Sequence, residues 1–490
     1  MYRIKTPLLS LLACALAMTS VAQKQPNIVF VLVDDMPWWG TSVQQLEGDP
    51  RSTSIYRDTP HVARLAKNGM TFANAYAAAG MCAPSRASIQ TGVSPARHLF
   101  SGNGNFGEDA PDEVYYDNRR GRARNAYMIE PSPIGKLNTE FATIGEKLQE
   151  RGYATAHIGK WHLYAGGPNA HGYDVSDGET SNDEGRPGAG MGKDDPKWIF
   201  SMTRRGIDFI SEQHRAQRPF YLQLSHYVEH NKQMSLPETL ESFVSMDTIS
   251  SLSGRNRRET STHGAAVKDL DTSIGMLLDH LDKLDIRENT YFVFTSDNGK
   301  GLYNGAQSVL RGDKWWLWEA GIRVPFMIEG PGIAANSRSD INIVGYDLLP
   351  TFYEMAGGDA PQLEASIDGK SLMPILAGRD VRAFENRPLF FHYPHLRNTT
   401  PHSAIVQGEY KLYTFYEIPD KPSLFNLRKD LGETTNLAPQ MPEKASAMQD
   451  ILFNYFKRVG AYLPKENPDA DTSKPRFDPD KIMPPTTAAL

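Results

Sequence analysis

The sequence predicts an α/β protein in which helices sandwich a large, mostly parallel sheet, followed by a smaller α+β C-terminal domain. Three observations lead to this fold class. Short, continuous apolar runs alternate with helical stretches over most of the 490 residues, which is the pattern of βαβ units. Polar side chains follow directly after several of these runs, as they do at the carboxyl edge of a parallel sheet. Past residue 380, short strand-like runs follow one another with only turns between them.

The first strand is predicted at 26–33, where PNIVFVLV is continuous, β-branched and short. Because such runs mark strands buried on both faces, we expect helices on both sides of the sheet. Four later runs are predicted as the other main strands, at 153–159, 220–225, 290–296 and 323–330.

Helices are predicted between these strands. Thr59 and Pro60 suit an N-cap and a first helical position, and Gly69 suits a stop. Pro84 is predicted to open a second helix that runs to Gly92. Longer helical stretches separate the later strands, at 139–151, 197–217 and 259–285.

The C-terminal part has a different pattern. FFHY, SAIVQG and YKLYTFY are short strand-like runs, and a helical stretch follows from 442 to 459. We therefore expect a main domain over residues 23–380 and a small α+β domain over 381–463. The tail over 464–490 is rich in Pro, Asp and Lys, and we expect it to wrap the surface or to be disordered.

The first 22 residues have the pattern of a signal peptide. Arg3 and Lys5 precede an apolar run over 7–22 that is too short to span a bilayer comfortably, and Ser20-Val21-Ala22 suits a cleavage site. The mature chain is then expected to begin near Gln23, in a periplasmic or secreted protein. A lipid attached to Cys14 is the alternative, which the continuation of the apolar run disfavours. No later segment is predicted to be a transmembrane anchor.

The balance of charge argues against nucleic acid as a partner. The chain has 52 Lys and Arg against 58 Asp and Glu, for a formal net charge of −6, whereas nucleic-acid-binding domains are basic. An anionic substrate would have to be attracted by a local basic pocket.

Oxygen ligands follow two of the predicted strands. Asp34 and Asp35 come directly after 26–33, and Asp297 and Asn298 follow 290–296. Either pair alone is explained by a turn or a cap. Together, three carboxylates at one sheet edge would repel each other without a cation, so they predict a metal site. The oxygen donors suit calcium, with magnesium as second choice.

Cationic and aromatic residues lie near the same strand ends. Arg86, Lys160, His162, His230 and Lys314 would form a cationic, proton-donating wall, although each alone is also explained as a surface residue. Aromatic side chains beside these stretches are expected either to stack on a sugar or to pack beneath the loops; they are Trp38, Trp39, Trp315, Trp316 and Trp318.

Cys82 would be the only cysteine left after the signal peptide is removed. An unpaired cysteine in an exported protein indicates either a small buried residue or a special chemical role. The stretch Cys82-Ala83-Pro84-Ser85-Arg86, followed by Thr91-Gly92, resembles the signature of the type I sulfatases, members of the alkaline-phosphatase-like superfamily. Further blocks of the resemblance are 152–162, Asp34-Asp35, Asp297-Asn298-Gly299, and Lys314 ahead of GIRVPF.

The resemblance implies a mechanism. A maturation enzyme would oxidise Cys82 to formylglycine, whose hydrated form attacks sulfur. Calcium would be held by Asp34, Asp35, Asp297, Asn298 and modified Cys82. Arg86 would steady the modified residue, and Lys160 and Lys314 would bind sulfate oxygens. His162 would act as a base, and His230 would protonate the leaving oxygen and contact the substrate. Independently of the resemblance, their position beside the polar stretches assigns Trp38 and Trp39 to substrate binding, as a surface on which a sugar stacks.

One block departs from the family pattern. The family usually has a proline just before the histidine of this block, but here the sequence is SHYVEHNKQ. His230 fits the spacing from the strand, and His226 is the competing candidate. The polar, Gly-rich stretches 100–135 and 174–196 are expected to rim the pocket and select the substrate.

We therefore expect an exported, formylglycine- and calcium-dependent sulfatase that acts on a sulfated oligo- or polysaccharide, such as glycosaminoglycan fragments. The alternatives are a phosphonate monoester or phosphodiester hydrolase of the same superfamily and an inactive sugar-binding homologue.

Overall fold

The computed structural model describes residues 25–54, 56–102, 126–132, 134–190, 192–246, 254–299, 309–396, 399–474 and 476–481. The predicted signal peptide, with Cys14 and the cleavage point before Gln23, lies outside these ranges. So does most of the stretch 100–135. No helix in the described part of the chain is long and apolar enough to cross a membrane.

An eight-stranded sheet forms the centre of the molecule, in the order β10-β2-β9-β8-β1-β7-β5-β6. Its strands are β10 (Ser337–Ser339), β2 (Met70–Phe72), β9 (Phe326–Glu329), β8 (Thr290–Ser296), β1 (Asn27–Val33), β7 (Phe220–Ser225), β5 (Ala154–Gly159) and β6 (Val175–Ser176). β1 pairs in parallel with β7 and β8, and β5 with β6 and β7. β9 runs antiparallel to β8 and β2. The predicted mostly parallel sheet is therefore confirmed.

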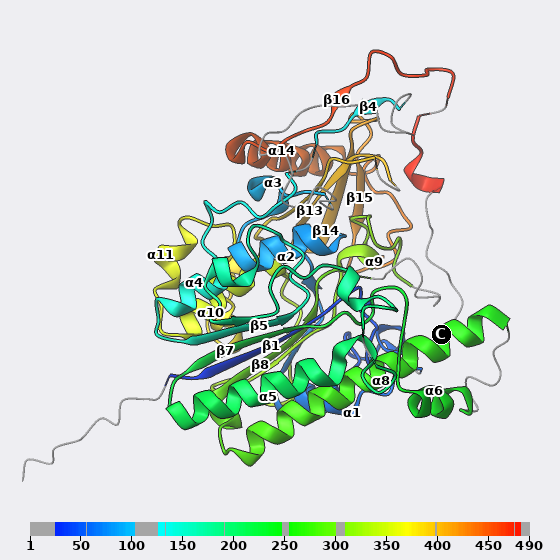
Figure 1. Cartoon of the computed structure of the whole chain (residues 1–490). Helices are drawn as coiled ribbons and strands as arrows, with labels where there is room; N and C mark the ends of the chain where they lie inside the picture. The colour runs from blue at the N-terminus through cyan, green and yellow to red at the C-terminus, as the bar shows by residue number, and fades with distance from the viewer. Residues whose placement is uncertain are drawn as a thin grey trace, which may run out of the picture.

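Both faces of the sheet are covered, because every residue of β1 is buried. Ile28, Phe30 and Leu32 belong to a core shared with α2 (Cys82–Thr91), α4 (Ile144–Gln149) and α10 (Leu348–Met355). The alternate residues of β1 belong to a core shared with α1 (Pro60–Asn68), α5 (Ile199–Ala216) and α8 (Gly254–Lys283). Figure 1 shows these two helical layers above and below the strands. The period of two along β1 thus divides its side chains between two apolar layers.

The helix α2 begins at Cys82, so the predicted start at Pro84 is two residues late. Proline is accepted in the first turn of a helix, since the N–H groups there make no intrahelical bond. The predicted end is confirmed: Gly92 has φ of 70°, and its N–H donates to the Ser88 carbonyl at 2.9 Å. A left-handed residue at this position favours glycine.

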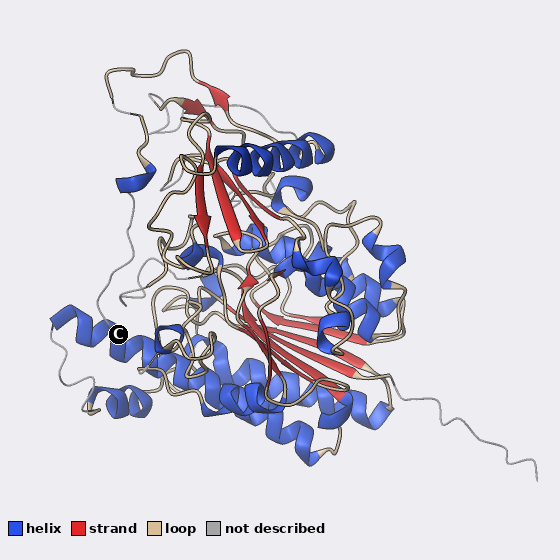
Figure 2. Cartoon of the chain, turned by 180° about the vertical axis from the view of Figure 1, so that it is seen from behind, coloured by secondary structure: helices blue, strands red, loops and turns tan. Residues whose placement is uncertain are grey.

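A second, four-stranded antiparallel sheet follows, in the order β12-β13-β14-β15. It comprises β12 (Leu389–Tyr393), β13 (His402–Gln407), β14 (Tyr410–Phe415) and β15 (Ser423–Asn426), of which β15 was not predicted. One face packs against α14 (Pro442–Val459). The other packs against Trp315, Trp316 and Trp318 of the main domain. Figure 2 shows the two sheets as separate layers of strands.

Shorter elements complete the described structure. They are β3 (Ala75–Tyr76), β4 (Met128–Ile129), β11 (Ile343–Val344), β16 (Lys465–Glu466), α3 (Pro95–His98), α6 (Pro237–Val244), α9 (Glu319–Ile322), α11 (Ala360–Glu364), α12 (Met373–Leu376) and α13 (Arg382–Glu385). The described part of the tail lies against the surface: β16 pairs with β4, and Phe477 stacks on Trp316. Of the two expectations for the tail, the described part fits the first: it lies along the surface of the protein.

Candidate active site

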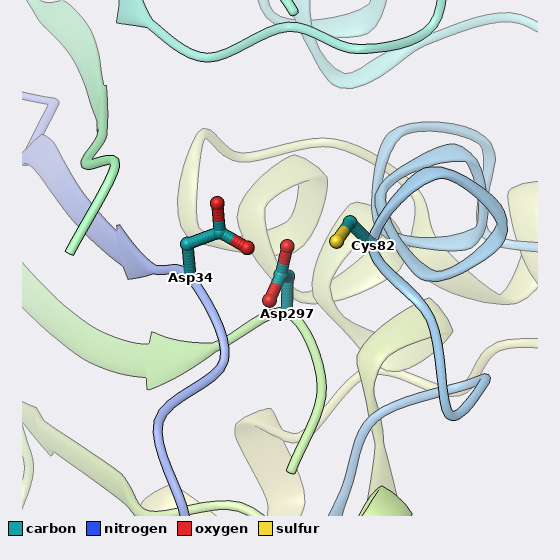
Figure 3. A group of neighbouring side chains, drawn as sticks. All are labelled: Asp34, Cys82 and Asp297. Atoms are coloured by element: carbon teal, nitrogen blue, oxygen red, sulfur yellow. The ribbon is translucent and has the colours of Figure 1, made fainter. Parts of the chain in front are cut away.

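The carboxyl ends of four neighbouring strands bring the predicted residues together. In the register of the sheet, the last residue of β1 pairs with Ser296 of β8, and Ser225 of β7 pairs with Gly159 of β5. The residues that follow these ends therefore lie at one edge. Figure 3 shows Asp34 after β1, Asp297 after β8 and Cys82 at the start of α2, with their side chains turned toward one another.

The oxygen ligands form one buried cluster. One ligand atom each from Asp34, Cys82 and Asp297 lie within 4.8 Å of one another. The Asp35 N–H donates to Asp297 Oδ1 at 3.1 Å, and Asn298 Nδ2 donates to Asp35 Oδ1 at 2.8 Å. These two bonds tie Asp35, Asp297 and Asn298 to one another beside that group.

Two of these oxygens lack a donor. Among the described residues, Asp34 Oδ1 and Asn298 Oδ1 are buried without a hydrogen-bond partner. A buried oxygen without a partner is costly, and hard oxygen donors in this number suit a calcium ion, with magnesium next. The residues present therefore fit a divalent cation.

Three cationic side chains surround the cluster. Lys160 Nζ lies 2.6 Å from Asp34 Oδ2, and Arg86 Nε lies 2.8 Å from Asp297 Oδ2. Lys314 Nζ lies 2.5 Å from Asp35 Oδ1 and 3.0 Å from the Cys82 sulfur. All are buried. The predicted cationic wall therefore lies directly against the predicted metal ligands.

The burial and the charges of this cluster shift the pKa values of Asp34 and Asp297 in opposite directions. Burial acts to raise the pKa of Asp34, but Lys160, His230, Arg86 and Lys314 hold it well below its ordinary value. Burial and the charge of Asp34 raise the pKa of Asp297 to about 6. Two carboxylates side by side thus oppose each other's ionisation, which a cation between them would reverse.

Burial likewise raises the pKa of the Cys82 thiol to about 12, although Lys160 and Lys314 act against it. The thiolate is the nucleophilic form of cysteine. An unmodified Cys82 is therefore a protonated, weak nucleophile. Its position in the first turn of α2 still places it where unpaired N–H groups favour negative charge.

The two candidate histidines have different surroundings. Burial lowers the pKa of His230 to about 4, and Asp34, Lys160, Asp35 and Lys314 also act on it. Burial alone lowers the pKa of His226 to about 4. The His226 side chain is fully buried, and neither of its ring nitrogens has a hydrogen-bond partner in the described chain. What distinguishes the two histidines is that the charges of Asp34, Lys160, Asp35 and Lys314 act on the pKa of His230 and not on that of His226.

His162, like Lys160, follows the end of β5 and is buried. Burial, followed by the charges of Lys160 and Arg86, holds the pKa of His162 well below its ordinary value. The backbone N–H of His162 donates to the Thr180 carbonyl at 2.8 Å. The Nδ1 atom is buried without a partner among the described residues. His162 is therefore a neutral imidazole with a ring nitrogen available for a proton.

The tryptophans near these strand ends are buried in apolar packing. Trp38 and Trp39 are 0% and 1% exposed and pack against Leu310 and Ala320. Trp38 Nε1 donates to the Ala73 carbonyl at 3.2 Å. The prediction that they bind substrate is wrong, because their ring faces are covered by core packing. Packing beneath the loops, the alternative for these residues and for Trp315, Trp316 and Trp318, is what the structure shows.

Sequence reasoning missed several residues around the site. Thr180 holds the backbone next to Lys160: its Oγ1 accepts from the backbone N–H of Trp161 at 2.9 Å, and its carbonyl accepts from the backbone N–H of His162. Lys197 is buried, and its Nζ donates to the Gly185 carbonyl at 3.0 Å. Both belong to or adjoin the stretch 174–196, which was expected only to rim the pocket. Nothing in their local sequence distinguishes them from solvated loop residues.

Comparison with known proteins matches the chain to two family models. The family model described as Sulfatase matches residues 26–358, and the model described as N-sulphoglucosamine sulphohydrolase, C-terminal, matches residues 311–457. N-acetylgalactosamine-6-sulfatase of Mus musculus is 30% identical over 425 residues, which cover 80% of this chain and 72% of that protein. Arylsulfatase A of Homo sapiens is 26% identical, covering 90% and 89%. A solved structure of Ps i-CgsB in complex with k-i-k-neocarrahexaose has 22% identity and a TM-score of 0.69, covering 88% and 93%, and shows the same fold.

Proposed function

Because this chain belongs to the sulfatase family and is a sulfuric ester hydrolase, we propose that it removes sulfate from a sulfated carbohydrate, using calcium and a formylglycine made from Cys82. The observation that supports this most is the meeting of Cys82, Asp34 and Asp297 within 4.8 Å, at the edge where two lysines also converge.

The substrate class follows from the relatives. N-acetylgalactosamine-6-sulfatase is named for the 6-sulfate of an amino sugar, and the C-terminal family match is named for N-sulphoglucosamine. We therefore place the substrate among sulfated oligo- or polysaccharides, including glycosaminoglycan fragments.

The metal would be held by Asp34, Asp35, Asp297 and Asn298, together with residue 82. A bound divalent cation neutralises sulfate oxygens and lowers the pKa of a coordinated hydroxyl. The donor-free oxygens of Asp34 and Asn298 support this assignment. Lys160 and Lys314, now paired with Asp34 and Asp35, would turn their ammonium groups to the sulfate once the carboxylates bind the cation.

Formylglycine would supply a hydrated aldehyde as the nucleophile in place of the weakly nucleophilic thiol. Arg86 is fixed by Asp297 and by the Lys160 carbonyl at 2.7 Å. Its remaining nitrogen NH2 is buried without a partner in the described chain, and it would donate to an oxygen of residue 82. Arg86 thereby orients that residue.

The histidines would move protons. His162, neutral and buried, would accept a proton when sulfate is released. His230, with a pKa of about 4, is neutral near pH 7 in this arrangement. A sulfate ester bound beside it brings negative charge, which raises the pKa of an imidazole. We propose that His230 takes up its proton with the substrate and donates it to the leaving oxygen.

Localisation and domain limits are also proposed. The chain is expected to be exported, cleaved near Gln23, and periplasmic or secreted, and to meet a formylglycine-generating maturation enzyme on the way. The catalytic domain would span 23–380, and the small C-terminal domain 381–463.

The test combines mass spectrometry with substrate screening. Protein made with its maturation enzyme should show formylglycine at position 82, and it should release sulfate from at least one member of a panel of defined sulfated oligosaccharides. An intact thiol at position 82 in fully active protein would overturn the proposal. A higher kcat/KM on aryl phosphodiesters than on any sulfate ester would favour the phosphodiesterase alternative.

A further inference from the structure

We infer that a buried cluster of Arg57, Glu229 and His263, called here the Glu229 cluster, positions His230 for proton donation to the leaving oxygen. The inference rests on the proposed function, because it assigns a task to residues that support His230 without touching the substrate. The three residues belong to segments far apart in the sequence.

In the Glu229 cluster, the two carboxylate oxygens of Glu229 contact the other two side chains. Arg57 NH1 makes an ion pair with Glu229 Oε1, and His263 Nδ1 lies 3.1 Å from Glu229 Oε2. The side chains of Arg57, Glu229 and His263 are 6%, 0% and 9% exposed. Arg57 comes from the segment after β1, Glu229 from the loop after β7, and His263 from α8. Each carboxylate oxygen of Glu229 therefore has its own partner on a different element.

The backbone of the same residue is tied to the metal-binding edge. The Glu229 N–H donates to the Asp34 carbonyl, and the Asp34 N–H donates to the Val228 carbonyl at 2.7 Å. Gln233 Nε2 donates to the Glu229 carbonyl. Residues 228–229 are thus bound to Asp34 in both directions. Fixing Glu229 fixes His230, the next residue, relative to a metal ligand.

Arg57 extends this connection. It also donates from NH1 to the Gly40 carbonyl at 3.3 Å, in the segment that follows Asp34 and Asp35. One guanidinium thus bridges the segment after β1 and the loop after β7. These are the two segments whose relative position decides where the His230 ring lies with respect to the metal ligands.

A stabilising role alone does not explain this buried ion pair. Removing two charges from water costs about as much free energy as their attraction returns, so apolar residues would serve stability equally well. Position 229 is also where the family resemblance leads one to expect proline, which restricts the backbone through its fixed φ. Here the backbone is restricted by the paired carboxylate of Glu229.

The consequence concerns the leaving group. An aryl sulfate with a nitrophenol leaving group departs as the phenolate and needs little help from an acid. A sugar alkoxide is a far poorer leaving group and needs the proton from His230. Loosening the Glu229 cluster should therefore harm cleavage of sugar sulfates more than cleavage of aryl sulfates.

The experiment compares mature, calcium-loaded wild type with Glu229→Gln, Arg57→Lys and His263→Asn on two substrates. These are 4-nitrophenyl sulfate and the sulfated oligosaccharide found in the screen. We expect kcat on the oligosaccharide to fall about 10- to 100-fold, as for residues that orient catalytic groups. We expect kcat on the aryl sulfate to fall less than about threefold, and KM to change little on either substrate.

The matched control is Glu329→Gln. Glu329 pairs with Arg287 through two contacts of 2.8 and 2.9 Å, at the opposite end of the strands. It should lower the melting temperature without changing the ratio of the two kcat values. If Glu229→Gln does not fold, the other two variants carry the comparison.

Equal losses on both substrates, or no loss, in folded variants would overturn the inference. A wild type that cleaves the aryl sulfate but no sugar sulfate would overturn the proposed substrate and, with it, the role given to the cluster. A formylglycine-bearing wild type that cleaves neither would overturn the proposed function as a whole.

Discussion

Replacing Glu433 with glutamine is expected to remove a pH dependence from the stability of this fold. Glu433 follows β15 and is fully buried. Its carboxylate accepts from the Glu319 N–H at 2.8 Å, and it lies 2.8 Å from the Tyr413 hydroxyl oxygen and 3.1 Å from Lys411 Nζ. Burial has the largest effect on the pKa of Glu433 and, with the charge of Glu319 and against that of Lys411, raises it from 4.5 to about 7.

The direction in which stability changes with pH follows from the state, folded or unfolded, in which Glu433 binds its proton more tightly. The Glu433 carboxyl holds its proton better in the folded than in the unfolded chain. Its contribution to stability is therefore complete below pH 4.5 and is lost as the pH rises through 7. A shift from 4.5 to about 7, at roughly 1.4 kcal/mol per pH unit, corresponds to about 3 kcal/mol. Most of this loss, about 2 to 3 kcal/mol, should fall between about pH 5 and pH 8.

The assay is denaturant unfolding of wild type and Glu433→Gln at a series of pH values from about 5 to 8. The glutamine amide accepts one hydrogen bond fewer than the carboxylate at every pH, which lowers the stability of the variant uniformly. The test therefore compares the slopes of the free energy of unfolding against pH, and not the absolute stabilities. Glu443→Gln on the exposed face of α14 serves as the control and should keep the wild-type slope. If Glu433→Gln and wild type lose stability in parallel, the proton does not reside on Glu433 and the reasoning fails.

The remaining predictions concern the site. Cys82→Ser, made in a host that cannot modify serine, should fold normally and lose turnover by roughly a thousandfold or more, as when a nucleophile is removed; near-normal turnover would exclude residue 82 as the nucleophile. Chelation should abolish activity and lower the melting temperature, and calcium at a hundredfold excess over its Kd should restore about 3 kcal/mol of stability; full activity in metal-free protein would contradict the metal site. His230→Gln should lower kcat on a sugar sulfate by about 10²- to 10⁴-fold, whereas His226→Gln should change mainly the melting temperature; the reverse result would assign the acid to His226.

Much of the fold could be predicted because the signal was local. β7 and β8 have the predicted bounds, and β1 and β5 differ from them by one residue at the N-terminal end. A continuous apolar run can be buried only where both faces are covered. The edge position of Asp34 and Asp297 followed from parallel topology, since parallel strands present their carboxyl ends together.

The rest depended on contacts that no local pattern encodes. Trp38 and Trp39 follow the proposed metal ligands Asp34 and Asp35 in the sequence, yet their indoles are buried in apolar packing with Leu310 and Ala320. Arg57, Glu229 and His263 are more than 30 residues apart, and each reads locally as a solvated polar residue. Only the fold reveals that they share one buried site.

The interface between β14 of the small sheet and residues 317–319 limits how related proteins can recombine during evolution. Lys411 of β14 lies 2.7 Å from Glu319, and Tyr413 donates to the Leu317 carbonyl at 2.6 Å, only a few residues past Lys314. The two family matches overlap here, since one ends at residue 358 and the other begins at 311. If recombination replaced the small sheet alone, the segment just after Lys314 would lose the contacts that Glu319 and Leu317 make with β14. Functional chimeras should therefore inherit the stretch from 311 to 323 together with the sheet that holds it.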